Sequence, residues 1–212
     1  MRKVLLVFFF IFPVCVFAQL NTKPKGFTLD LGAGATLHNV FNNVDVSNGS
    51  SALASLIHVN FRYKDGILGY GLKFEHMKFA TSNDSAVVFR NAVANLLQYN
   101  TSVTILEKEK FSLYVGAGVG VNSLHYEQRD SSGVFGKVVM EGFSGSFFTG
   151  INYHFKERFG IFVQAGYIYN VNRIVDFEVN GMLIDSFRNR DIGDIIYNLR
   201  GIDFKTGIRF AF

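Results

Sequence analysis

The chain ends in the stretch Leu199-Arg200-Gly201-Ile202-Asp203-Phe204-Lys205-Thr206-Gly207-Ile208-Arg209-Phe210-Ala211-Phe212. From Ile202 onward, every second side chain is apolar or carries a methyl group, and charged or small residues fill the positions between them. Successive side chains of a β-strand point to opposite faces, so this alternation predicts a strand with one apolar and one polar face. An apolar face of this length has to be covered, and the rest of the chain indicates that lipid covers it.

The same period of two residues recurs in seven earlier segments, which predicts eight strands in an all-β fold. Their apolar faces run through residues 27–37, 53–63, 68–74, 93–105, 111–121, 143–155 and 159–169. Near His76 the apolar positions shift by one residue toward Met77 and Phe79, and such a shift predicts a β-bulge. No helical period and no domain boundary interrupts the series.

Short charged turns and longer polar connections alternate between the predicted strands. The short turns fall at 64–66, 107–110 and 156–158, and the longer loops are predicted at 38–51, 81–85, 127–139 and 172–198. In the last of these, Asn180-Gly181 favours a type I′ hairpin, so the seventh strand could run on and fold back before the final one. Transmembrane barrels show this asymmetry, with an even strand number, short periplasmic turns and longer outer loops.

Aromatic residues gather on the apolar face beside the short turns and the chain ends, which predicts a ring at one membrane interface. The members of this predicted ring are Phe27, Phe61, Tyr63, Phe111, Tyr153, Phe155, Phe159, Phe210 and Phe212. A soluble lipocalin-like barrel, with its apolar face turned inward, is the alternative. The aligned aromatic residues argue against it, because they would have no interface to occupy.

The composition of the 212 residues fits a sheet embedded in a membrane. Charged residues make up 18% of the chain, against about 25% in an ordinary soluble domain. The two prolines, Pro13 and Pro24, precede the first predicted strand, so the backbone beyond them can form hydrogen bonds without interruption. The formal net charge is +4, and scattered Lys and Arg residues offer no basic patch for a nucleic acid.

The N-terminal residues read as a secretory signal peptide over residues 1–18, with a basic start, an apolar run and cleavage between Ala18 and Gln19. A short periplasmic lead-in is expected over residues 19–25 and the barrel over residues 26–212. The single cysteine, Cys15, lies within the leader, so the mature chain has no thiol for disulfides, metal ligation or nucleophilic catalysis.

With its leader, eight strands, uneven loops and terminal Phe212, the chain resembles the small eight-stranded outer-membrane barrels of the OmpA/OmpX type, also called the PorT-like outer-membrane β-barrel family. The resemblance implies an antiparallel up-and-down transmembrane β-barrel in the outer membrane of a Gram-negative bacterium. It also implies that the barrel assembly machinery reads a C-terminal signal formed by Ile208, Phe210 and Phe212.

Charged residues on the predicted inward face form a candidate lumen cluster. Its members are Asp30, Arg62, Lys73, Glu75, Asp203, Lys205 and Arg209. The interior of an eight-stranded barrel is only wide enough for side chains to fill, so these groups are expected to pair with one another. Asp30 and Arg209 lie at similar heights on the first and last strands, which closure makes neighbours, and Arg62 lies near that level. We therefore predict a structural contact among these three residues.

Other chemistry has weaker support in the sequence. Five histidines, His38, His58, His76, His125 and His154, lack metal-ligand spacing and are expected to be isolated, so no cofactor or metal is predicted. Ser123 and His125 invite a lipid A-modifying enzyme as an alternative, but no nucleophile elbow accompanies them, and we predict no enzyme. A small passive pore is the other alternative to a structural or surface-interaction role. The expected partners are outer-membrane lipid and a surface protein bound through loops 38–51, 127–139 and 172–198.

Overall fold

The computed structural model describes residues 25–42, 50–80, 88–129, 135–184 and 196–212. Nearly all of them lie in strands: β1 (Gly26–Asn42), β2 (Ser50–Asp65), β3 (Leu68–Phe79), β4 (Val88–Glu107), β5 (Phe111–Arg129), β6 (Phe135–Lys156), β7 (Phe159–Val179), β8 (Met182–Ile184) and β9 (Ile196–Ala211). Within these ranges, no helix is long and apolar enough to cross a membrane.

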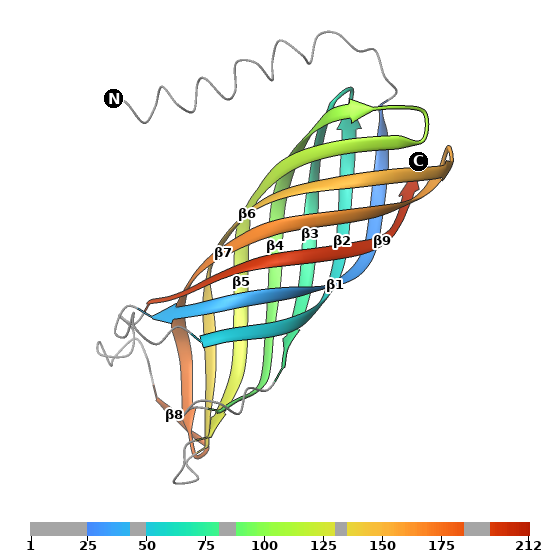
Figure 1. Ribbon diagram of the computed structural model, residues 1–212. Helices are drawn as coiled ribbons and strands as arrows, with labels where there is room; N and C mark the ends of the chain where they lie inside the picture. The colour runs from blue at the N-terminus through green and yellow to red at the C-terminus, as the bar shows by residue number, and fades with distance from the viewer. Residues whose placement is uncertain (1–24, 43–49, 81–87, 130–134, 185–195) are drawn as a thin grey trace, which may run out of the picture.

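The strands close into an antiparallel up-and-down barrel, as predicted (Figure 1). Strands β1 to β7 each pair with the next strand in sequence, and β9 pairs with both β7 and β1. The short β8 pairs with the end of β7, so it extends the wall without entering the ring. Eight of the nine strands therefore form the barrel, and β9 is its closing strand.

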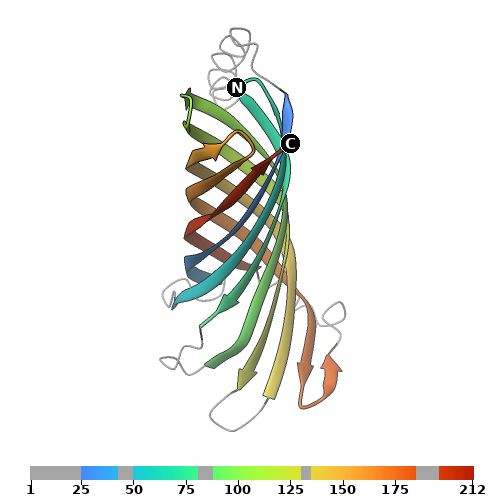
Figure 2. The same ribbon diagram turned by 90° about the vertical axis from the view of Figure 1, so that its right-hand side faces the viewer.

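The two ends of the barrel differ in their connections (Figures 1 and 2). The turns at 66–67, 108–110 and 157–158 lie at the same end as the C-terminus, and we call this the turn end. The opposite end is called the loop end. Figure 2 shows that β5, β6 and β7 reach farther toward it than β1, β2 and β3 do, in keeping with their lengths of 19, 22 and 21 residues.

The outer surface of the ring is apolar over much of its height. Phe143 and Phe147 are 76% and 71% exposed, and Val119 is 66% exposed. At the turn end, outward aromatic rings touch one another in two series of contacts, which confirms much of the predicted aromatic ring. These contacts are Phe27–Phe61 at 5.3 Å and Phe27–Tyr63 at 5.0 Å, and Tyr153–Phe155, Phe155–Phe159 and Phe159–Phe210 at 5.3, 6.1 and 5.6 Å between ring centroids.

The two faces of the sheet exchange polarity toward the loop end. On β5, the outward Val121 is followed by Ser123 and His125, while the inward Asn122 is followed by Leu124. Inward positions nearer the loop end are likewise apolar on β2, β3, β4, β6 and β7, where they hold Leu56, Met77, Leu96, Met140 and Ile174. We call the level of this exchange the polarity boundary. The outward residues at which it occurs are Ser55, His76, Asn95, Ser123, Glu141 and Arg173.

The bulge predicted near His76 is wrong. β3 pairs with β2 in one continuous register from Leu68 to Phe79, and Met77 lies buried inside the barrel. The apolar residues move from the outward to the inward positions of β3 at this level. The pairing of β3 with β2 stays continuous, so no residue is inserted. Register shifts occur instead at Arg90/Val93, Thr104/Leu106, Val139/Met140 and His154/Lys156.

The three longest predicted loops are shorter than the sequence suggested. Of 38–51, only 43–49 lies outside β1 and β2, and of 127–139, only 130–134 lies outside β5 and β6. Most of 172–198 belongs to β7, β8 and β9. Asn, Ser and Asp are typical of loops, but they also suit the water-facing side of a strand that continues past the apolar belt. The fourth predicted loop, 81–85, lies outside the described residues.

The hairpin predicted at Asn180-Gly181 is confirmed. Asn180 and Gly181 have φ angles of 49° and 84°, and β8 folds back to pair with the last residues of β7. Positive φ at both central positions is what a type I′ turn requires, and Asn-Gly tolerates it best.

Candidate functional site

Asp30, Arg62 and Arg209 form a buried ion cluster in the part of the lumen nearer the turn end, which we call the Asp30 cluster. Asp30 on β1 is the direct cross-strand partner of Arg209 on β9. Arg209 donates from Nε to Oδ1 and from Nη2 to Oδ2 of Asp30, both at 2.6 Å. Arg62 Nη2 donates to the same Oδ2 at 2.6 Å. The predicted contact is therefore present, and two guanidinium groups share one carboxylate.

Tyr114 completes this cluster and was not singled out in the sequence as a site residue. Its ring is 2% exposed and lies under both guanidinium groups, 4.9 Å from Arg62 Cζ and 5.7 Å from Arg209 Cζ to the ring centroid. Its hydroxyl donates to Gln164 Oε1 at 3.2 Å. The available signal was a large ring at an inward position of β5 followed by three inward glycines, Gly116, Gly118 and Gly120, because such small neighbours leave room for it.

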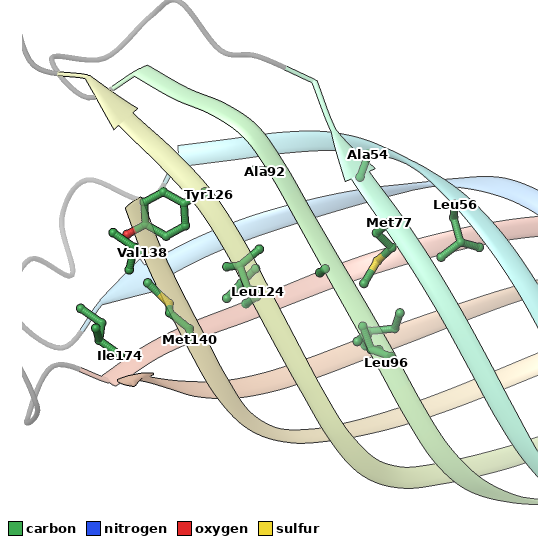
Figure 3. Packing of buried hydrophobic residues seen from close by; sticks show 13 residues of the cluster. Ala54, Leu56, Met77, Ala92, Leu96, Leu124, Tyr126, Val138, Met140 and Ile174 are labelled. Atoms are coloured by element: carbon green, nitrogen blue, oxygen red, sulfur yellow. The ribbon is translucent and has the colours of Figure 1, made fainter. Parts of the chain in front are cut away.

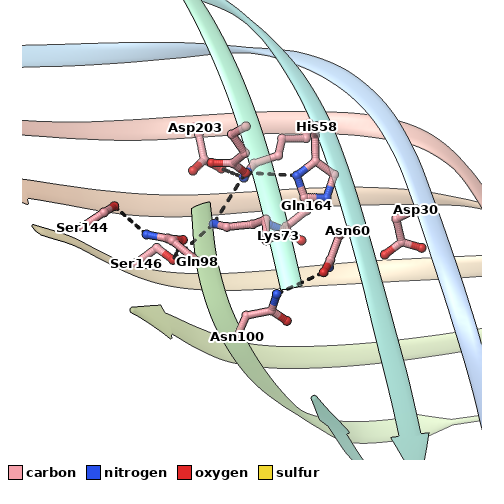
Figure 4. A network of polar contacts seen from close by, with 12 residues as sticks. Asp30, His58, Asn60, Lys73, Gln98, Asn100, Ser144, Ser146, Gln164 and Asp203 are labelled. Atoms are coloured by element: carbon pink, nitrogen blue, oxygen red, sulfur yellow. Dashed lines mark hydrogen bonds and ion pairs between the residues drawn. The ribbon is translucent and has the colours of Figure 1, made fainter. Parts of the chain in front are cut away.

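A second buried network, which we call the Glu75 cluster, joins Glu75 to Lys205, Lys73 and His58. Figure 4 shows its members His58, Lys73 and Asp203. Glu75 Oε1 accepts from Lys205 Nζ, lies 3.5 Å from Lys73 Nζ and lies 3.0 Å from His58 Nδ1. Lys205 Nζ also lies 3.3 Å from Asp203 Oδ1. Two lysines thus face two carboxylates, so the side-chain charges balance. The structure therefore divides the seven predicted lumen residues between two clusters.

Neutral side chains extend the Glu75 cluster across the lumen (Figure 4). Lys73 Nζ on β3 donates to Ser146 Oγ on β6 at 3.3 Å. Gln98 on β4 donates to Ser144 Oγ at 2.6 Å and accepts from Ser146 Oγ at 2.8 Å. These strands are not neighbours in the ring, so the bonds run through the interior and fill it at this level.

An apolar cluster occupies the lumen nearer the loop end (Figure 3). Its members are Ala54, Leu56, Met77, Ala92, Ala94, Leu96, Leu124, Tyr126, Val138, Met140, Ile168, Ile174 and Leu199, with Phe79 and Phe177 packed against them. They come from seven of the eight ring strands. The sequence prediction of a polar inward face missed this cluster. The exchange of polar and apolar positions after His76, Asn95 and Ser123 was the signal that could have revealed it.

The prediction that the histidines are isolated is wrong for His58 and His76. His58 is not isolated, because it lies directly opposite Glu75 across β2 and β3 and contacts its carboxylate. His76 Nδ1 lies 2.8 Å from Asn95 Oδ1. Ser123 and His125 lie on the outward side of β5, at and beyond the polarity boundary. Across the described ranges, no three His, Cys, Asp or Glu side chains gather as a metal-binding group.

The predicted assembly signal and the predicted signal-peptide cleavage site both stay predictions, because no contact in the structure tests either role. Ile208 and Phe212 of the predicted assembly signal are 38% and 73% exposed on the outer surface of β9 and just beyond it. The backbone of Phe212 exchanges hydrogen bonds with Phe27, which holds the chain end against β1. The predicted cleavage site at Ala18 and Gln19 lies outside the described residues.

Comparison with known proteins identifies the fold. A scan of protein-family models gives no match, and a search of curated proteins gives none. Among solved structures, Neisserial surface protein A has a TM-score of 0.57 at 14% identity, covering 90% of this chain and 100% of its own. Ail, the attachment invasion locus protein of Yersinia pestis, has a TM-score of 0.51 at 12% identity, covering 88% and 100%. OprG of Pseudomonas aeruginosa has a TM-score of 0.51 at 13% identity, covering 88% and 96%. The chain therefore has the fold of small OmpA/OmpX-like outer-membrane barrels.

Proposed function

We propose that this chain is an integral outer-membrane β-barrel with a closed lumen and a structural or surface-interaction role. The observation that carries the proposal is the order of layers inside the barrel. The Asp30 cluster, the Glu75 cluster and the apolar cluster succeed one another from the turn end toward the loop end. Ion pairs and packed apolar side chains fill the lumen at successive levels, which supports a non-conducting barrel.

The outer surface supports the membrane position. On the turn-end side of the polarity boundary the outward face is mainly apolar, as contact with lipid requires. On the loop-end side it carries polar residues on most strands, with Leu53 of β2 as an exposed apolar exception. The aromatic contacts at the turn end then mark the periplasmic interface, and the polarity boundary marks the outer interface. In this arrangement the turn end faces the periplasm and the loop end faces the outside.

A surface role is supported by the strands that continue beyond the polarity boundary. β5, β6 and β7 run past Ser123, Glu141 and Arg173, and the β7–β8 hairpin adds Met182, which is 72% exposed. Two proteins of similar fold are named a surface protein and an attachment protein. We therefore propose that these protruding strands, with the connecting loops, contact a partner outside the cell.

The biogenesis that fits this proposal is export through a cleaved signal peptide, residues 1–18, followed by assembly into the outer membrane. The outward side chains of Ile208, Phe210 and Phe212 would serve as the assembly signal. Deleting Phe212 should prevent the heat-modifiable gel shift of the folded barrel while export to the periplasm continues.

Thiol labelling of intact cells tests the orientation. The mature chain has no cysteine, so Met182→Cys introduces a single thiol on the β7–β8 hairpin. A membrane-impermeant maleimide should label it in whole cells. The matched control is Lys110→Cys in an exposed turn at the turn end, which should be labelled only after the outer membrane is opened. Labelling of Lys110→Cys alone in intact cells would reverse the proposed orientation.

Planar-bilayer recordings and lipid A mass spectra test the alternative roles. A closed lumen predicts no conductance above the lipid background, and a non-enzymatic barrel predicts identical lipid A with and without the protein. Stable single-channel steps would favour a passive pore, and a change in acyl chain number would favour an enzyme.

A further inference from the structure

A cavity of about 660 Å³ opens at the turn end of the barrel. Its lining includes Arg62 and Arg209 of the Asp30 cluster together with Tyr114, Ser112 and Asn152. We call these five residues the cavity floor. All five are buried, and their polar atoms come from β2, β5, β6 and β9, so the barrel wall holds them in place.

The floor carries more positive than negative side-chain charge. Arg62 and Arg209 both bind the one carboxylate of Asp30. The neighbouring acid Glu107, which also lines the cavity, is paired with Lys64, whose Nζ lies 2.9 Å from its Oε1. A buried guanidinium without its own counter-charge attracts an anion, because charges interact strongly where water is largely excluded.

Hydrogen-bond donors remain available beside this charge. A guanidinium carries five N–H groups. Arg209 uses Nε and Nη2 for Asp30, and in the part of the chain that the structure describes its Nη1 has no hydrogen-bond partner. Arg62 Nη1 makes a long contact of 3.5 Å to Ser102 Oγ. Ser112 Oγ accepts from Asn152 Nδ2 at 2.8 Å, so its own hydroxyl is able to donate.

The unpaired side-chain oxygen of Asn152 indicates a ligand that also carries a hydrogen-bond donor. Its side chain is 4% exposed, and Oδ1 has no hydrogen-bond partner among the described residues. A buried acceptor without a partner is uncommon, because leaving it unpaired costs about 1–3 kcal/mol. A ligand hydroxyl or N–H would satisfy this atom while its anionic group takes the arginine donors.

The rim of the cavity carries charges of both signs, from Lys25, Lys64, Lys110 and Lys156 and from Glu107, Glu109 and Glu157. Lys25 lies 3.1 Å from Asp65, and hydrogen bonding and attraction to this carboxylate raise the pKa of Lys25. On the rim, Lys25 pairs with Asp65 and Lys64 pairs with Glu107, so each of these two lysines has its own carboxylate. On the floor, Arg62 and Arg209 share the carboxylate of Asp30.

We infer that the turn-end cavity binds a small oxyanion that also carries a hydroxyl group, with the arginines holding the anionic oxygens and Asn152 accepting from the hydroxyl. The proposed function contributes only the compartment, which is the periplasm. Hydrogen phosphate is the simplest probe with both features. Sulfate has the same shape but no hydroxyl at neutral pH, so it tests the contribution of Asn152.

The experiment is calorimetric titration of the folded mature barrel in detergent at constant ionic strength. Phosphate should bind saturably at one site, and sulfate more weakly. Arg209→Lys keeps the positive charge but removes the paired N–H donors of the guanidinium. It should weaken phosphate binding at least about tenfold, as expected for a lost hydrogen bond to a charged group. Asn152→Ala should weaken phosphate binding and leave sulfate binding unchanged.

The controls separate binding from folding. Asp65→Asn changes a turn-end carboxylate away from the floor and should leave the affinity within about twofold, as for an exposed charge. Ser112→Ala provides a mild floor variant should Arg209→Lys fail the heat-modifiable gel shift, and it should also weaken phosphate binding. Phosphate that binds no better than chloride, or equally well to Ser112→Ala and wild type, would overturn the site. Equal affinity for phosphate and sulfate would overturn the role of Asn152. Because binding is measured in detergent, these results do not depend on the orientation tested by Met182→Cys.

Discussion

The two halves of the lumen are built from the same strands but hold opposite chemistry. Nearer the turn end, β1, β2, β3 and β9 direct Asp30, Arg62, Glu75 and Lys205 inward, and ion pairs join them. Nearer the loop end, β3, β4 and β6 direct Met77, Leu96 and Met140 inward, and they pack in the apolar cluster. The difference indicates that what surrounds the barrel decides what fills it.

Lipid and water place opposite demands on a sheet. Where lipid covers the outside, apolar residues face outward and the alternating positions are free to carry charge, provided that the charges pair inside. Where water covers the outside, apolar residues gain most by turning inward. The polarity boundary is therefore the level at which apolar side chains change from the outer face of the sheet to the inner face.

Removing the Asp30 carboxylate, which Arg62 and Arg209 share, should give the largest loss of stability in the turn-end half of the lumen. Asp30→Ala leaves Arg62 and Arg209 buried without their anion, and we expect a loss of about 3–5 kcal/mol in the free energy of unfolding. Urea unfolding in detergent, followed by the heat-modifiable gel shift, measures it. The control Asp65→Ala breaks the exposed pair with Lys25 and should leave the transition unchanged. Equal midpoints for the two variants would contradict a structural role for the Asp30 cluster.

Adjacent residues on β4 test the apolar half. Leu96 is fully buried in the apolar cluster, whereas Leu97 is 51% exposed on the outer face. Leu96→Ala should cost about 3 kcal/mol of unfolding free energy, because it removes buried methyl groups and leaves a cavity. The same substitution at Leu97 in detergent should cost clearly less. Similar losses at both positions would mean that the loop-end lumen is loosely packed.

Arginine substitutions along β5 test where lipid ends. Val119 lies on the outward face below the polarity boundary and His125 lies beyond it. In lipid vesicles, Val119→Arg should cost about 2–4 kcal/mol, whereas His125→Arg should cost about 0–1 kcal/mol. Unfolding followed by circular dichroism would report the difference. A large cost at His125 would place the membrane boundary farther toward the loop end.

The smallest effect is expected at the aromatic contacts of the turn end. Phe27 stacks on Phe61 at 5.3 Å with an interplanar angle of 12°. Phe27→Leu keeps the side chain apolar but removes the ring contact, so we expect a loss of about 1 kcal/mol. The double variant Phe27→Leu/Phe61→Leu should cost less than the sum of the single variants. Strict additivity would show that the stacking itself contributes nothing.

Most of the architecture was predictable because it rests on local patterns. Alternation along each strand, the short turn at 107–110 and the Asn180-Gly181 hairpin all depend on neighbours in the chain. The contact of Asp30 with Arg209 was predictable for a similar reason. Once β9 closes onto β1, the distance of each residue from the turn end determines its cross-strand partner.

The errors have a common physical origin. The bulge expected at His76 and the long loops expected at 38–51 and 172–198 assumed that a polar residue on the outward side ends or shifts a strand. The strands continue because backbone pairing does not depend on side-chain polarity. Only the medium outside changes at that level, and in a single strand the resulting exchange of apolar positions looks the same as a bulge or the end of the strand.

The sequence was sufficient for the strand number, for the faces of the strands up to the polarity boundary and for the contact that closes the ring, because each follows from a two-residue period and from order along the chain. The three-dimensional structure decided which inward residues meet across the lumen. Glu75 meets Lys205 and Gln98 meets Ser146 across non-neighbouring strands. Such contacts depend on the tilt and stagger of the closed barrel, which arise from all strands together. Closure of the barrel also brings together the floor of the turn-end cavity, whose residues come from β2, β5, β6 and β9.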